Sequence, residues 1–450
     1  SGVIHIGNFR EAITVDLVKR AFKYMKHDVR HIHSWDDYDV FRKIPKNMPN
    51  PEILEKHLRM SIIDTPDTTN EGENYADKNR LAVEKTLPLV GINPEYKYQS
   101  KKYQSCDYAD DIKTALEHTK EIKEILDKFR KEPLNDNWLP TSIFCSNCKK
   151  DTITLQEWKG DYIVYYECEC GHKEEFDFSK KGIIKLAWRV DWPMRWNYEN
   201  VHFEPGGKDH SSPGGSYSTG KMISETVWKK MAPAYTMYDF IKIKGMGGKI
   251  SSSTGNVITL KECLEIYEPE IIRFLFAGTR PNTEFSISFD QDVIKIYEDY
   301  DKLERIFYKK EEVNEKNYEK NKWVYILSQV DEDQEMIPPK MPVQIPFREL
   351  TMMLCIKDMD EQRVLKHYAD LGKVEDKVDE SRLATRISCA KNWLNKYADD
   401  NFKFIVKQEK DNTYIASLDD TKKKALSMLK EILLSDSTGE DLETAIFKIH

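Results

Sequence analysis

The 450-residue sequence lacks the marks of a membrane or exported protein. No apolar run approaches the roughly 20 residues that span a bilayer, and the first residues show no basic-then-apolar signal pattern. Internal repeats are also missing. We therefore expect a cytoplasmic protein without a membrane partner, and a chain of this length predicts two or three domains.

A surplus of positive charge is missing too, because the formal net charge is −8. This balance argues against a protein that coats nucleic acid by bulk attraction, although local basic patches could still hold a large RNA. The 8 cysteines are spread unevenly, which favours a reducing compartment over a disulfide framework. Four of them are isolated and are predicted to be small buried hydrophobes: Cys106, Cys263, Cys355 and Cys389.

The first functional candidate is a loop rich in glycine and hydroxyl groups at residues 247–255. Lys249 could offset the charge of a leaving pyrophosphate, while Ser251, Ser252 and Ser253 donate hydrogen bonds to its oxygens. Such loops are common on protein surfaces, so an ordinary solvated loop is the alternative.

A second polar turn lies at the front of the chain and runs into a helical pattern. The N-terminus of a helix favours a phosphate. His5 and Asn8 could both donate to that phosphate, and Gly7 leaves room for the nucleotide. An ordinary capped helix with a surface histidine is the alternative. The strand that should lead into such a turn is absent, so we treat residue 1 as an artificial edge.

Together the two stretches resemble the signatures of class I aminoacyl-tRNA synthetases. His-Ile-Gly-Asn at residues 5–8 is similar to the HIGH signature, and Lys-Ile-Ser-Ser-Ser at residues 249–253 is similar to KMSKS. Between them, residues 204–210 resemble the Gly-x-Asp segment that contacts adenosine in that class.

Three further strings narrow the resemblance to the archaeal-type lysyl-tRNA synthetases. They are residues 34–39 with 42–45, then 188–196, then 206–210. The resemblance extends over nearly the whole chain.

This resemblance implies a lysine–tRNA ligase. ATP and lysine would form lysyl-adenylate and pyrophosphate with the help of Mg²⁺, and the lysyl group would pass to the 2′-hydroxyl of the terminal adenosine of tRNA(Lys). The catalytic residues would be His5, Asn8 and Lys249. The ATP-binding residues would be Gly7, Gly207, Asp209, Lys249, Ser251, Ser252 and Ser253.

The amino-acid pocket is predicted from an aromatic and acidic string that follows the apolar run 183–188, which itself predicts a strand. At the end of that strand Trp192 could cover the lysine methylenes, and Asp191 could pair with the head group. A core of packed tryptophans with a surface aspartate is the alternative. His210 resembles family positions near the substrate, where it would orient rather than exchange protons. The choice of lysine follows mainly from the resemblance.

Two positions depart from the signatures. Asn8 replaces the final His of HIGH, which keeps a donor without a cationic form, and Ser252 replaces the second Lys of KMSKS. Lys221, Lys242, Lys244 or a magnesium ion could offset the missing charge. Two alternatives therefore stay open: a class I synthetase for another amino acid, and a catalytically inactive tRNA-binding scaffold protein.

Cysteine spacing predicts a structural zinc site. Cys145 and Cys148 form one pair and Cys168 and Cys170 a second, with His172 two residues further on. Strands predicted between the pairs indicate a zinc ribbon folded as a hairpin, in which Zn²⁺ replaces a core. His172 could replace one member of the second pair, and unrelated reduced thiols are the alternative.

The predicted fold class is α/β. A Rossmann-like parallel-sheet catalytic domain covers residues 1–290 with a zinc-ribbon-like insertion at about 138–182, and an all-α helical bundle covers residues 291–450. By resemblance the bundle is the helical anticodon-binding domain. Inside it, residues 309–323 predict a linker or mobile loop, and residues 402–407 predict a buried edge strand or a base-stacking platform. We expect a monomer.

Overall fold

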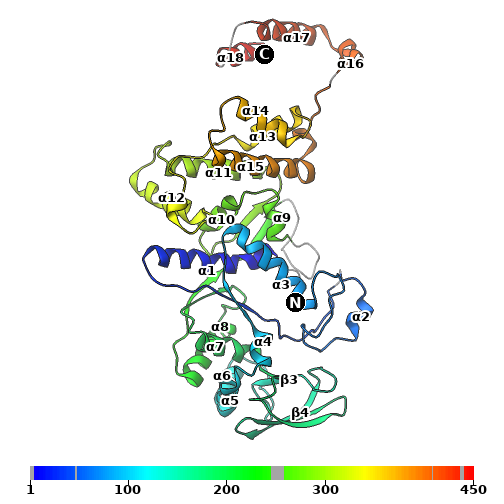
Figure 1. Ribbon diagram of the computed structural model, residues 1–450, viewed down its shortest axis with the longest axis vertical. Coiled ribbons are helices and arrows are strands. Elements are labelled where there is room, and N and C mark those ends of the chain that lie inside the picture. The colour runs from blue at the N-terminus through cyan, green and yellow to red at the C-terminus, as the bar shows by residue number, and fades with distance from the viewer. Residues whose placement is uncertain (1–4, 46–47, 245–257, 408, 436–439, 450) are drawn as a thin grey trace.

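The computed structural model describes residues 5–45, 48–244, 258–407, 409–435 and 440–449. The molecule is elongated, with the α/β elements at one end and the C-terminal helices at the other (Figure 1). Among the described residues, no helix is both long and apolar enough to cross a membrane.

Parallel strand pairs confirm the predicted α/β class. The pairs are β1 (Ile32–Trp35) with β2 (Glu95–Tyr98), β8 (Phe203–Gly207) with β9 (Ala234–Tyr238), and β10 (Ile241–Lys244) with β11 (Phe285–Ser288). Helix α1 (Ile6–Tyr24) packs against β8 and buries Ile6, Phe9 and Ile13 in the main core. The predicted motif residues follow β1, β8 and β10, at the strand ends where parallel sheets bind ligands.

The insertion is a separate antiparallel unit. It begins after β3 (Thr141–Ile143) and returns through β7 (Ile184–Leu186), which pairs with β3. Between them lie β4 (Ile153–Gly160), β5 (Ile163–Cys168) and β6 (Lys173–Asp177). The expected hairpin is thus part of a three-stranded sheet in the order β4-β5-β6.

Short helices make up most of the remaining α/β part. They are α2 (Pro51–Glu55), α3 (Tyr75–Thr86), η1 (Leu87–Val90), α4 (Gln99–Gln104), α5 (Ala109–Glu117), α6 (Thr119–Asp127), α7 (Trp188–Tyr198), α8 (Ser216–Ile223), the π-helical turn η2 (Ser224–Trp228), α9 (Leu260–Leu264) and α10 (Pro269–Ala277).

Helix α7 corrects one prediction. The strand expected over residues 183–188 ends at Leu186, and the aromatic string after it is helical. The four-residue spacing of Trp188, Trp192 and Trp196 is the reason, because it stacks the three rings along one helix face. Their ring centroids lie 5.5 and 4.9 Å apart in succession.

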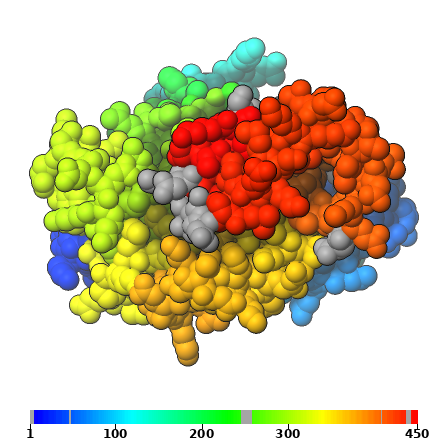
Figure 2. Space-filling view, turned by 90° about the horizontal axis from the view of Figure 1, so that it is seen from above, coloured from blue at the N-terminus to red at the C-terminus, as the bar shows by residue number. Residues whose placement is uncertain are grey.

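The C-terminal part is helical, as predicted. Its elements are α11 (Asp292–Phe307), α12 (Glu315–Ser328), η3 (Gln334–Met336), α13 (Phe347–Ile356), α14 (Glu361–Asp370), α15 (Lys377–Lys396), η4 (Asp400–Phe402), α16 (Asn412–Ser417), α17 (Asp420–Leu433) and α18 (Glu440–Phe447). Figure 2 looks onto this end, where the last helices cover much of the visible face.

Two local predictions in this part are wrong. The linker expected over residues 309–323 contains most of α12, which Asn314 caps and which buries Tyr325 and Ile326 against its neighbours. No edge strand forms among the described residues of 402–407, because no strand lies beside them, and Ile405 is 85% exposed. The base-stacking platform stays a prediction.

The two parts share one core rather than meeting at a polar interface. A single cluster of buried side chains extends from Ile6 in α1 to Trp393 in α15. Within it Arg386 of α15 pairs with Glu268 at 2.6 Å and with Asp301 at 2.8 Å. The predicted boundary near residue 290 is therefore crossed by apolar packing and by buried ion pairs.

Candidate active site

The N-terminus of α1 carries the first predicted site residues. His5 is the N-cap, and its Nδ1 accepts a hydrogen bond from the Gly7 amide at 3.0 Å. In return the Asn8 side-chain oxygen accepts from the His5 amide at 3.2 Å. This reciprocal capping box closes the turn and leaves the helix end facing outward with its positive dipole.

Capping also decides the protonation state of His5. Burial lowers the pKa of the imidazole, so the ring is neutral near pH 7. Since Nδ1 accepts from Gly7, the proton of the neutral ring lies on Nε2. His5 is therefore a neutral donor through Nε2.

Gly7 has a reason beyond the one that the sequence suggested. A Cβ at this position would lie 2.7 Å from both Cε1 and Nδ1 of the His5 ring. Only glycine lets the imidazole fold back over the first turn of the helix.

The two signature stretches approach each other through the backbone. The Ile6 amide donates to the Ile258 carbonyl at 2.7 Å, and Ile258 is the first described residue after 245–257. The chain enters that segment from β10 at Lys244. The predicted residues Lys249, Ser251, Ser252 and Ser253 lie outside the described residues, but the chain leaves their segment at the N-terminus of α1.

The end of β8 supplies the glycine segment. A Cβ on Gly206 would lie 2.0 Å from the Tyr235 hydroxyl, and a Cβ on Gly207 would lie 2.5 Å from Oδ1 of Asp209. Both glycines are buried, whereas Asp209 is exposed. The Asp209 carboxylate thus folds over a bare backbone and is open to a ligand.

His210 and Trp192 lie together, as the sequence predicted for a substrate pocket. The His210 ring centroid is 5.6 Å from that of Trp188 and 6.2 Å from that of Trp192. Indole Nε1 of Trp192 donates to Oε1 of Glu204 at 3.1 Å. The helix α7 therefore presents an aromatic face to the end of β8.

Glu204 and Glu11 form a carboxylate pair that the sequence reasoning missed. Burial and the nearby charge of Glu11 raise the pKa of Glu204 to about 7. Glu11 is accessible from solvent, yet the enclosing walls and the charge of Asp36 raise its pKa to about 7 as well. Tyr238 donates to Glu11 at 3.1 Å. Carboxylates that hinder each other's ionisation favour a cationic ligand between them.

Asp191 lies behind this pair rather than in it. It is 2% exposed, pairs with Arg195 at 3.0 Å and accepts from the Tyr103 hydroxyl. Arg195 reaches on to Asp36 at 2.8 Å. The geometry favours a supporting role for Asp191 through Arg195, and its direct pairing with a substrate stays a prediction.

A sequence signal for the missed residues did exist. Glu11 follows Asn8 by three positions, so both lie on the same face of α1. Glu204 lies two residues before Gly206 in a strand, and side chains two apart point to the same side. What the sequence could not give is that the two faces meet.

The cysteine pairs come together as a tetrad. The sulfur atoms of Cys145, Cys148, Cys168 and Cys170 all lie within 4.8 Å of one another. His172 stays outside this group, and its Nε2 lies 3.5 Å from a Glu174 oxygen. Four thiols at this separation form a donor set that suits tetrahedral Zn²⁺.

A nucleotide site at the N-terminus of a helix, beside parallel strands and a cation-binding wall, defines an enzyme that activates a charged substrate with a nucleoside triphosphate. A family model described as tRNA synthetases class I (K) matches residues 1–331. The chain belongs to this family of class I aminoacyl-tRNA synthetases.

Curated relatives agree with the family. The chain is 48% identical to a lysine–tRNA ligase of Borreliella burgdorferi over 452 aligned residues, which cover 100% of this chain and 85% of that protein. It is 46% identical to the enzyme of Treponema pallidum, over 91% of this chain and 77% of the relative. For Thermococcus kodakarensis the identity is 42%, over 90% and 77%.

Proposed function

We propose that this site activates lysine with ATP and transfers the lysyl group to tRNA(Lys). The observation that carries the proposal is the backbone contact between Ile6 and Ile258, because it joins the two signature stretches beside the acidic and aromatic wall. The chemistry needs no protein nucleophile. A lysine carboxylate oxygen attacks the α-phosphorus of ATP, and the bond to the bridging oxygen breaks to release pyrophosphate.

At the nucleotide end, neutral donors and one cation stabilise the developing charge. Nε2–H of His5 and the amides at the start of α1 would face the α-phosphate. The Asn8 Nδ2 group makes no hydrogen bond to any residue that the structure describes, so it can donate there too. Lys249 would balance the leaving pyrophosphate, and Mg²⁺ would share that charge.

Adenosine would lie against the glycines at the end of β8. Gly207 allows the backbone to approach the ring, and the exposed Asp209 carboxylate can accept from the ribose hydroxyls. This assignment keeps the ribose next to the α1 turn through the packing of α1 on β8.

At the amino-acid end, the ammonium would lie between Glu11 and Glu204 with its methylenes on Trp192. A cation lowers the pKa of both carboxyls and so ionises the pair as it binds. His210 would orient the substrate from the aromatic face. A neutral amino acid of the same length would leave the two acids uncompensated.

Zinc would bind the four cysteines and hold the insertion together, which has little apolar core of its own. Zn²⁺ there supplies fold stability rather than acid–base chemistry, because the four thiolates fill its coordination shell. We further propose that the protein works as a monomer in the cytoplasm, which light scattering of the purified enzyme would test.

Amino-acid-dependent pyrophosphate exchange tests the proposal. The full chain is assayed with Mg²⁺, ATP and each of the twenty amino acids, with and without tRNA. We expect lysine alone to stimulate exchange. Stimulation by another amino acid would move the protein to a different specificity. No stimulation in either condition would favour the inactive tRNA-binding alternative.

A further inference from the structure

The acidic segment that follows β1 supports the amino-acid end of the site. Asp36 binds Arg195 at 2.8 Å, and Asp39 binds Lys185 of β7 at 2.6 Å. Arg195 in turn carries Asp191 and lies near both Glu11 and Glu204. A shift of residues 36–39 would therefore move the charges around the proposed ammonium site.

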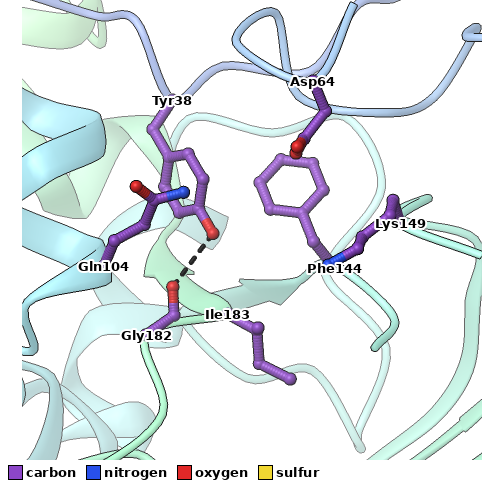
Figure 3. A pocket seen from close by; sticks show the side chains of 7 residues that line it. All are labelled: Tyr38, Asp64, Gln104, Phe144, Lys149, Gly182 and Ile183. Atoms are coloured by element: carbon purple, nitrogen blue, oxygen red, sulfur yellow. Dashed lines mark hydrogen bonds between the residues drawn. The ribbon is translucent and has the colours of Figure 1, made fainter. Parts of the chain in front are cut away.

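Tyr38, in the middle of this segment, is seated on the base of the insertion (Figure 3). It is 3% exposed, and its hydroxyl donates to the Gly182 carbonyl at 2.9 Å. Its ring centroid lies 5.0 Å from that of Phe144, the residue before Cys145. Phe144 is itself tied to Ile183 by a backbone hydrogen bond of 2.8 Å.

A second contact clasps the returning part of the same segment. Arg59 pairs with Asp151 at 2.8 Å, and the Asp151 amide donates to the Arg59 carbonyl at 2.9 Å. Next to this pair, Met60 and Lys150 form an isolated antiparallel bridge. The Ile62 amide donates to the Asp39 carbonyl at 2.8 Å, so the clasp leads directly back to the acidic residues.

The clasp grows out of the first cysteine pair. The Lys149 amide donates to the Cys145 carbonyl at 2.8 Å, and the Cys145 amide donates to the Lys150 carbonyl at 2.9 Å. The turn that presents Cys145 and Cys148 therefore also sets the position of Asp151. Zinc ligands, clasp and acidic segment form one continuous chain of contacts.

The joint is not tightly filled. A cavity of about 160 Å³ lies between Tyr38 and Asp64 on one side and Phe144, Lys149 and Ile183 on the other (Figure 3). Because packing is incomplete there, a few hydrogen bonds and one ion pair have to define the position of the segment.

We infer that the zinc-ribbon insertion is a positioning element for the amino-acid end of the site, acting through Tyr38 and the Arg59–Asp151 clasp. The inference rests on the proposed function, since it concerns the binding of lysine. It makes Tyr38 and Asp151 positioning residues, because neither touches the substrate. The nucleotide end does not depend on this joint, as it is built from α1 and β8.

Three variants of the full-length enzyme test the inference: Tyr38→Phe, Asp151→Ala and, as a matched control, Lys159→Ala. Lys159 lies at the far end of the ribbon, where it pairs with Glu157. For each we would measure zinc content, the KM for lysine and for ATP in pyrophosphate exchange, and lysine binding by calorimetry. Amide hydrogen exchange of peptides that cover residues 36–41 would report the segment itself.

We expect Tyr38→Phe and Asp151→Ala to raise the KM and the Kd for lysine by about three- to tenfold, the effect of one lost hydrogen bond or partly exposed ion pair. The KM for ATP should stay within about twofold, zinc should stay bound, and exchange of residues 36–41 should become faster. The control should match the wild type throughout.

Unchanged lysine binding in both variants, or equal losses for lysine and ATP, would overturn the inference. A wild-type enzyme without lysine-dependent exchange would instead overturn the proposed function. The two failures are distinguishable, because the first appears only in the variants.

Discussion

The two ends of the site are built on different principles. The nucleotide end consists of a helix N-terminus, two glycines and the chain leaving residues 245–257, so its contacts come mostly from backbone groups. The amino-acid end consists of side chains from α1, α7 and β8, with Trp192 and two carboxylates of raised pKa. One end depends on local conformation and the other on how distant elements meet.

This difference predicts which measurements respond to a mutation. Changes at the nucleotide end should slow adenylate formation, because its donors act on charge that develops in the transition state. Changes at the amino-acid end should weaken lysine binding, because its carboxylates pair with a charge that is already present in the substrate.

The largest effect is expected at Lys249. Lys249→Ala should lower kcat for pyrophosphate exchange by about 10²- to 10³-fold, as removal of a transition-state donor does, while the Kd for ATP changes far less. Lys242→Ala is the control, since Lys242 pairs with Glu284 at 2.6 Å. Equal losses in kcat and ATP binding would contradict the transition-state role.

Removal of one acid sharpens the comparison from the other end. Glu204→Gln should raise the KM for lysine by about tenfold or more, the cost of a lost charge-assisted contact, and leave the KM for ATP unchanged. Glu225→Gln, an exposed change on η2, is the matched control. A rise in both KM values would show that the two ends are not separate.

Lysine binding should also depend on pH in a direction set by this acid. Below its pKa of about 7 Glu204 is protonated and neutral, so the Kd for lysine should fall as the pH rises from about 6 to 8. Calorimetry across this range would measure the change. In Glu204→Gln the dependence should become weaker; an identical profile would assign it to another group.

A smaller effect on rate is expected at Gly7. The added methyl group of Gly7→Ala would lie 2.7 Å from the His5 ring and displace it, which should lower kcat by about tenfold. Because both changes act on the same imidazole, His5→Ala with Gly7→Ala should be no slower than His5→Ala alone. Additive losses in the double variant would argue against this explanation.

The smallest effect is expected at His172, whose ring lies outside the cysteine tetrad. After dialysis His172→Ala should keep its zinc and its activity, whereas Cys170→Ser should lose zinc affinity by more than about 100-fold, beyond the cost of an outer-shell change. Metal analysis of both proteins decides the ligand set. Zinc loss in His172→Ala would return the histidine to it.

Sequence reasoning worked best where a short segment carries the whole signal. The turn at residues 5–8 caps its helix as expected, and the cysteine pairs meet as a tetrad. It failed where charged composition or an apolar run was assigned without a partner. Residues 315–328 are helical because Tyr325 and Ile326 find a core, and residues 188–198 are helical because their tryptophans stack at four-residue spacing.

What the sequence by itself determined is therefore the α/β class, the family, the turn that presents His5 and the zinc-ligand spacing, since each depends on neighbours along the chain. Only the tertiary structure decided that Glu11 and Glu204 share one site and that Asp191 lies behind it on Arg195. The physical reason is that a pKa, a salt bridge or a pocket depends on groups close in space, and here those groups are nearly two hundred positions apart.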